Sequence, residues 1–200
     1  MKRILTGLAV LALVAGCAAD TNPDSAPEKV AAAAYRAPGS SVILFTMVNN
    51  RSGSGGHSAL LVNGSQQVIF DPAGSFRDAR VTERGDVLYG MTPGWVNAYK
   101  SAHARDTHHV VSQEIRVTPA QAEKLLQLVI SNGDVPGAYC ANSTSGILGQ
   151  VEGFKSIERT FYPVNLMEQV AKLPGVKTSR HFEDDSGNVV AGVRAAKAVE

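Results

Sequence analysis

The sequence predicts a single α+β domain, and three observations indicate this. The chain has 200 residues, which is enough for one domain with a substantial core. Short runs rich in β-branched and aromatic residues are mixed with longer segments that have a helical apolar period. No internal repeat and no second block of different composition divides the chain. We therefore expect one folded domain over residues 40–190.

The charge balance gives no indication of a strongly charged partner. The formal net charge is +1, and removal of residues 1–16 leaves 17 basic against 18 acidic side chains. No basic patch stands out that would bind an anionic polymer. We expect a monomer that does not bind nucleic acid.

The N-terminus has the pattern of a targeting segment. Lys2 and Arg3 precede an apolar run over residues 4–15 that is too short to span a bilayer. The following Leu13-Val-Ala-Gly-Cys17 resembles the lipobox of bacterial lipoproteins. Two alternatives are an ordinary secretory signal cleaved nearby and an uncleaved anchor.

The lipobox resemblance implies that residues 1–16 are a signal peptide and that Cys17 carries a lipid. Such a residue anchors a protein lastingly to a membrane, because it bears more than one acyl chain. Ala18, in place of an aspartate, favours sorting to the outer membrane of a bacterial envelope, on its periplasmic face.

Both ends of the mature chain have compositions that do not favour a core. Residues 17–39 are rich in Ala, Pro, Asp and Ser without a sustained apolar period, which predicts a flexible tether. Residues 191–200 are rich in Ala and Lys, and we expect a C-terminal tail or a frayed helix.

The first strands of the domain bring a histidine and an aspartate together. Residues 42–48 form a continuous apolar run, and the Gly-rich loop after it leads to His57. Residues 58–62 and 67–70 predict a hairpin around Asn63-Gly64, which would supply the positive φ angles of a tight turn. With Leu61 opposite Val68, the open end of the hairpin holds His57 and Asp71.

The rest of the domain alternates between helix and strand. Thr118 as N-cap and Pro119 at the first helical position predict a helix to about Ser131. Its buried stripe comprises Ala122, Leu125, Leu126, Val129 and Ile130. The other expected elements are strands over 86–89, 110–117 and 176–182 and helices over 93–102, 140–149 and 164–172.

Cys140 is the one cysteine that would keep a free thiol if Cys17 is lipidated. It could be a buried apolar residue, pair with another chain or be reactive. A polar neighbourhood and a position at the start of a helix favour reactivity, because helix N-terminal N–H groups stabilise both a thiolate and an oxyanion.

A nucleophilic cysteine needs a base and a group that orients the base. His57 is the candidate base and Asp71 the candidate orienting group, although Asp71-Pro-Ala-Gly is also an ordinary turn sequence. His103, His108 and His109 lack partners at metal-ligand spacing, so we expect no metal and no cofactor. We expect Trp95, Tyr89 and Tyr99 to form core or groove wall.

Three stretches together resemble a known superfamily. They are Gly56-His-Ser-Ala-Leu-Leu-Val62, Val68-Ile-Phe-Asp-Pro-Ala-Gly-Ser75 and Tyr139-Cys-Ala-Asn-Ser-Thr144. They resemble the circularly permuted NlpC/P60 branch of papain-like proteins, which is related to lecithin:retinol acyltransferase-like and YiiX-like proteins. In that branch the histidine strand precedes the cysteine helix.

The resemblance implies a permuted papain-like fold, with an antiparallel sheet that carries the histidine and a helix N-terminus that carries the cysteine. It gives Cys140 the role of nucleophile, His57 that of base and Asp71 the third position. Ser58, Tyr139 and Asn142 are further candidates for substrate or oxyanion contacts.

The expected function is an envelope-anchored cysteine hydrolase that cleaves an amide or ester bond through an acyl-enzyme. Peptide bonds of peptidoglycan are the favoured substrate. The alternatives are a lipid acyl hydrolase or acyltransferase of the same fold, and a lipoprotein that binds or assembles without catalysis.

Overall fold

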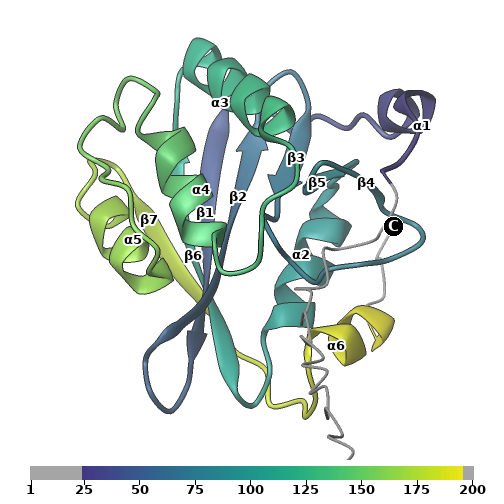
Figure 1. Cartoon of the computed structure of the whole chain (residues 1–200), viewed down its shortest axis with the longest axis vertical. Coiled ribbons are helices and arrows are strands. Elements are labelled where there is room, and N and C mark those ends of the chain that lie inside the picture. The colour runs from purple at the N-terminus through teal and green to yellow at the C-terminus, as the bar shows by residue number, and fades with distance from the viewer. Residues whose placement is uncertain (1–23, 196–200) are drawn as a thin grey trace, which may run out of the picture.

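A seven-stranded antiparallel sheet forms the centre of the molecule (Figure 1). The computed structural model describes residues 24–195. The strands are β1 (Ser41–Asn49), β2 (Gly55–Asn63), β3 (Gln67–Phe70), β4 (Thr82–Arg84), β5 (Val87–Tyr89), β6 (His108–Arg116) and β7 (Lys177–His181), in the spatial order β4-β5-β3-β2-β1-β6-β7. The helices in this part of the chain are α1 (Pro27–Ala32), α2 (Pro93–His103), α3 (Pro119–Asn132), α4 (Cys140–Leu148), α5 (Pro163–Val170) and α6 (Val189–Ala195).

Helices cover both faces of the central strands. Side chains such as Leu44 and Leu60 pack with those of α3, α4 and α5, whereas Phe45 and Leu61 pack with those of α2 and α6. Figure 1 shows α3, α4 and α5 grouped apart from α2 and α6. Strands buried on both faces have continuous apolar sequences instead of alternating ones. This explains the unbroken apolar run of β1, and the mixed α/β class that the sequence predicts is confirmed.

Most predicted elements lie within a few residues of their expected positions. The clearest case is α3, where the Thr118 hydroxyl accepts the Gln121 N–H and the Gln121 side chain accepts the Thr118 N–H. This reciprocal capping box fixes the start of the helix. Ala122, Leu125, Leu126 and Val129 are buried, while Ile130 is partly buried.

The predicted register of the hairpin is wrong by one residue. Val62 pairs with Val68 and Asn63 with Gln67, so that Leu61 faces Ile69. Neither Asn63 nor Gly64 has a positive φ. The physical reason is that the Asn63 side chain is committed elsewhere: it accepts the Ala37 N–H and donates to the carbonyls of Ala37 and Gly39.

The expectation of a flexible tether is wrong for residues 24–39. This segment contains α1 and returns to the turn between β2 and β3, where the Tyr35 carbonyl accepts the Gln67 N–H at 2.6 Å. Near its start, the Ser25 N–H donates to the Glu83 carbonyl at the edge of the sheet. The low apolar content of this segment predicted a flexible tether, but hydrogen bonds to the domain hold it in place of apolar contacts. The signal peptide over residues 1–16, Cys17 and residues 18–23 lie outside the described residues.

The predicted C-terminal tail also begins too early. Residues 189–195 form α6, and Val193 is buried in the core on the α2 side of the sheet. Val189 packs against the same cluster, so these two valines hold α6 on the domain, while residues 196–200 lie outside the described part. None of the helices in residues 24–195 is both long and apolar enough to cross a lipid bilayer.

Replacement of Asn63 by alanine tests the docking of residues 24–39. The variant loses a buried acceptor and two donors, so we expect a loss of about 1 to 3 kcal/mol in the free energy of unfolding. We also expect faster proteolysis within residues 24–39, measured by mass spectrometry of the fragments. Ser65→Ala, at an exposed position in the same turn, is the control. Equal cleavage of the two variants would show that this segment is not held by Asn63.

Candidate active site

The candidate site forms where β2 extends beyond its neighbour β3. The pairing of these strands starts at Leu60 and Phe70, so residues 57–59 of β2 have no β3 partner. The Ser58 N–H lies at this uncovered edge, and its hydrogen bonding is one of the causes that lower the pKa of Cys140. The start of α4 thus occupies the space that β3 vacates.

A β-bulge sets the direction of His57. Met47 pairs with His57 and Val48 with Gly55, so Gly56 is an extra residue on β2. A bulge of this kind bends the strand and re-aims the adjacent side chain. The Gly-rich sequence before His57 also suits the close packing here, since a Cβ on Gly55 would lie 2.6 Å from the Cβ of Pro163.

Cys140 is the first residue of α4, and its side chain is buried. The Ser143 N–H donates to the Tyr139 carbonyl, so the N–H groups before it lack an acceptor within the helix. Burial acts to raise the pKa of Cys140, but it is outweighed by the hydrogen bond and charge of His57 and by the N–H groups of Ser58 and Ala141. The net effect lowers the pKa of the thiol and favours the thiolate.

His57 joins Cys140 to a buried carboxylate. Its Nε2 lies 2.7 Å from Oδ1 of Asp71, and its other nitrogen remains for the thiol. Burial acts to lower the pKa of His57, but the charge and hydrogen bond of Asp71, together with Cys140, raise it to about 10. For Asp71, burial is outweighed by His57 and by Tyr99, so the carboxyl pKa falls below its usual value. The arrangement favours an imidazolium between two anions.

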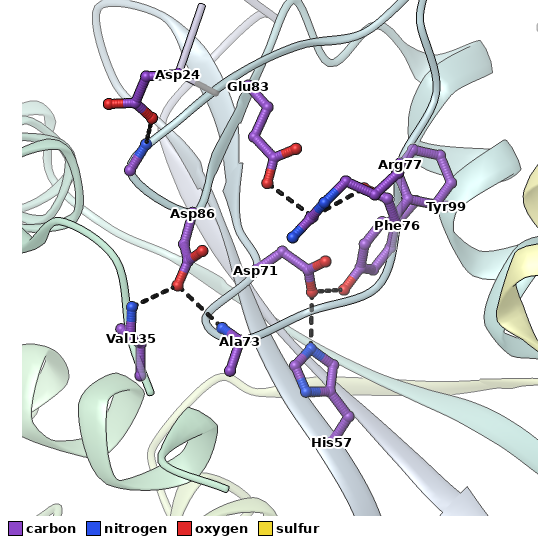
Figure 2. A network of polar contacts seen from close by, with 11 residues as sticks. Asp24, His57, Asp71, Ala73, Phe76, Arg77, Glu83, Asp86, Tyr99 and Val135 are labelled. Atoms are coloured by element: carbon purple, nitrogen blue, oxygen red, sulfur yellow. Dashed lines mark hydrogen bonds and ion pairs between the residues drawn. The ribbon is translucent and has the colours of Figure 1, made fainter. Parts of the chain in front are cut away.

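Tyr99 is a member of the site that sequence reasoning placed only in the core or groove wall. Its hydroxyl donates to the same Oδ1 of Asp71 at 2.6 Å (Figure 2). Burial, followed by the charge of Asp71, raises the pKa of Tyr99 well above its usual value, so the hydroxyl stays a donor. No local motif marks this tyrosine, because its partner is 28 residues away along the chain.

Gly74 makes room for the Asp71 carboxylate. A Cβ at position 74 would lie 1.9 Å from Oδ2 of Asp71, which excludes any larger residue unless the carboxylate moves. Within the described residues, Oδ2 is buried without a hydrogen-bond partner. The Asp71-Pro-Ala-Gly74 sequence therefore forms a turn and also holds the Asp71 carboxylate against the backbone of Gly74. The sequence had offered these two roles, ordinary turn and orienting group, as alternatives.

Asp86 connects the two loops that hold the site, and sequence reasoning missed it. Its Oδ2 accepts the N–H of Ala73, beside Asp71, at 2.9 Å and the N–H of Val135, in the loop before Cys140, at 2.8 Å (Figure 2). Its backbone carbonyl accepts the Asp71 N–H at 2.8 Å. Asp86 is thus a positioning residue. The sequence places Asp86 only at the start of the expected strand over residues 86–89.

The other predicted site residues lie around Cys140. Ser58 contributes its backbone N–H, while its hydroxyl is buried and has no partner in the described part of the chain. Tyr139 is 46% exposed and packs edge-on against Phe161, with ring centroids 5.1 Å apart. Asn142 is half-buried in the first turn of α4. The structure therefore brings Cys140, His57, Asp71, Ser58, Tyr139 and Asn142 into one region.

The three histidines that the sequence shows no metal partners for, His103, His108 and His109, lie on two different elements. His103 is buried beside Tyr99, whereas His108 and His109 lie on β6, where His109 bonds the Asn50 side chain. Across residues 24–195, no group of three or more His, Cys, Asp or Glu side chains is arranged to hold a metal ion.

Comparisons with protein-family models, with curated proteins and with solved structures find no match for this chain. The case for a function therefore rests on the residues and their geometry.

Substitutions of Asp86 test its positioning role. Asp86→Ala removes the acceptor of two backbone N–H groups, and we expect a loss of about 2 to 4 kcal/mol in unfolding free energy. Because the loops of Asp71 and Cys140 lose their common partner, the pH midpoint of Cys140 alkylation should also rise. Asp86→Asn keeps a carbonyl acceptor and should restore both properties in large part. If Asp86→Ala lowered stability without moving the alkylation midpoint, Asp86 would have a structural role alone.

Proposed function

We propose that this protein is a cysteine hydrolase that cleaves an amide or ester bond through an acyl-enzyme on Cys140. The observation that carries the proposal is the contact chain from the Cys140 thiol through His57 to the buried Asp71, with 2.7 Å between the last two. A nucleophile, a base and a group that orients the base are the parts this chemistry needs. Such perturbed titrating groups are typical of functional sites.

The acylation step uses each of these residues. The Cys140 thiolate attacks the carbonyl carbon, and unpaired N–H groups at the start of α4 stabilise the oxyanion. The imidazolium of His57 then gives its proton to the leaving nitrogen or oxygen as the bond to carbon breaks. Asp71 and Tyr99 keep the ring oriented.

The second step regenerates the enzyme. His57, now neutral, takes a proton from water while the water oxygen bonds the acyl carbon and the bond from carbon to sulfur breaks. The products are a carboxylic acid and the original thiolate–imidazolium pair. Neither step requires a cofactor.

The chain order His57, Asp71, Cys140 supports membership of the circularly permuted NlpC/P60 branch of papain-like proteins. The antiparallel sheet with His57 on a central strand and Cys140 at a helix start is the arrangement this family would require. The lipobox around Cys17 supports an anchor in the bacterial envelope, with the outer membrane as the favoured location.

Peptide bonds of peptidoglycan are the substrate we favour in that compartment. A specific observation supports lipid acyl groups as a second candidate: Tyr139, Phe161 and Tyr162 are 46%, 51% and 74% exposed near the nucleophile. Exposed aromatic side chains bind apolar chains as well as sugar and peptide groups. The two candidates share the same acyl-enzyme chemistry.

Alkylation with iodoacetamide tests the activated thiol. Because the pKa of Cys140 is lowered, we expect alkylation at pH 7 to be at least about tenfold faster than for N-acetylcysteine. The rate should fall as the pH drops through the lowered pKa, since only the thiolate reacts. His57→Gln removes the imidazolium and should move the midpoint to higher pH.

His109→Gln, at a histidine outside the site, is the matched control and should leave the profile unchanged. An alkylation rate equal to that of the free thiol, with the same midpoint in His57→Gln, would rule out an activated Cys140.

Turnover measurements separate the substrate classes. We expect the wild-type protein to release peptide fragments from a panel of muropeptides, and Cys140→Ala to lose at least about 1000-fold in rate because the nucleophile is gone. The rate should also fall above about pH 10, where His57 loses the proton needed by the leaving group. Release of fatty acid from phospholipid vesicles with no muropeptide cleavage would favour the lipid candidate. A Cys140→Ala strain that keeps the biological role would favour a non-catalytic module.

A further inference from the structure

A cavity of about 340 Å³ lies directly beside His57. It is bounded by the start of β2, the turn after Asp71, the C-terminal end of α2 and the segment before α6, and its lining includes Gly56, Gly74, His103 and Asn188. Cys140 is not among its lining residues. The cavity therefore lies on the histidine side of the reactive pair.

His103 presents an unused hydrogen-bond acceptor at this cavity. It is 4% exposed, and its Nδ1 lies 2.8 Å from the Tyr99 carbonyl, so Nδ1 must carry the hydrogen. Burial, the largest cause, lowers the pKa of His103 to about 4, so the ring is neutral. Its Nε2 then has a free lone pair, and within residues 24–195 it has no hydrogen-bond partner and is not sealed from solvent.

The acceptor is close to the candidate proton donor. The rings of His103 and His57 are nearly parallel, at 12°, with centroids 6.1 Å apart. Both rings line the cavity. A ligand in it would meet the side chain of His57 and the lone pair of His103 together.

The strongest charge at the cavity already has partners. Arg105 is buried, its Nε donates to the Ala102 carbonyl, and its guanidinium lies 3.3 Å from the Asp185 carboxylate. Apart from the histidines, of which His57 has its charge balanced by Asp71 and Cys140, the remaining polar lining comes from uncharged groups such as the hydroxyls of Ser75 and Thr107 and the amide of Asn188. The cavity therefore suits a small polar ligand more than an anion or a long acyl chain.

We propose that this cavity binds the leaving-group half of the substrate, and that His103 Nε2 accepts a hydrogen bond from an N–H or O–H of that half. The proposal rests on the proposed hydrolase function. A general acid must lie within hydrogen-bond reach of the leaving atom, so the group attached to that atom extends past His57 into the space that His57 lines. The volume, near the lower end of ligand pockets, fits a leaving group of about one amino acid or one sugar.

Acyl transfer in the reverse direction makes this subsite measurable. An amine that occupies it attacks the acyl-enzyme in place of water, gives a proton to His57 and leaves with the acyl group as its carbon–sulfur bond to Cys140 breaks. p-Nitrophenyl acetate supplies the acetyl-enzyme, and release of p-nitrophenol reports its formation.

The probes are ethanolamine and 2-methoxyethylamine, which have the same amine but differ in the hydroxyl donor. In the wild-type protein we expect the ratio of acetylated amine to acetate to be about five to ten times higher with ethanolamine than with 2-methoxyethylamine. This factor is the effect of one hydrogen bond. His103→Phe should abolish this preference, and His109→Phe should keep it. The ratio of acetylated amine to acetate is independent of how much acetyl-enzyme forms.

Because His103 is buried, His103→Phe could fail to fold, and a second variant at an exposed position tests the same cavity. Ser75 is exposed and lines the cavity, so Ser75→Trp should block it without touching the core and should also remove the preference. An unchanged preference in folded His103→Phe and Ser75→Trp would overturn the proposal while the hydrolase function stands.

If the wild-type protein released p-nitrophenol no faster than its Cys140→Ala variant, this would count against the hydrolase function instead. The cavity is then tested by binding, with ¹⁵N-histidine-labelled Cys140→Ala. We expect ethanolamine to give a saturable shift of the His103 Nε2 resonance that 2-methoxyethylamine does not give. No shift with either amine would overturn the cavity proposal on its own.

Discussion

The buried carboxylate of Asp71 is the constraint on which the rest of the site depends. A charge removed from water is tolerated only with partners, and here one oxygen accepts from both His57 and Tyr99. The other oxygen lies against the bare backbone of Gly74. His57 is consequently held in its charged form, and that charge in turn favours the thiolate of Cys140.

The sheet makes this arrangement possible because β3 is much shorter than β2. The early end of β3 releases the chain at Asp71 and leaves an edge of β2 open, where the start of α4 approaches. Asp86 then fixes the two departing loops to each other. The site is therefore built at a gap in the sheet, where groups from both of its helical layers can meet.

Local patterns were sufficient for much of the fold and for the candidate residues. The N-cap at Thr118, the apolar run of β1 and the hairpin that joins His57 to Asp71 are all encoded over a few residues. The roles of Tyr99, Asp86 and His103 are not, because each depends on a partner fixed by tertiary packing. The predictions of the hairpin register and of a flexible tether over residues 24–39 were wrong for the same reason, because Asn63 bonds to residues far back in the chain.

Tyr99 and His103 on α2 contribute to two different features of the molecule, the hydrogen bonds of Asp71 and the cavity beside His57. They are one helical turn apart, with the Tyr99 hydroxyl bonded to the Asp71 carboxylate and His103 lining the neighbouring cavity. The helix α4, which begins at Cys140, belongs to the other helical layer, with α3 and α5 (Figure 1). Substitutions in the last turn of α2 or in the segment before α6 would thus change the cavity without replacing any residue that contacts Cys140.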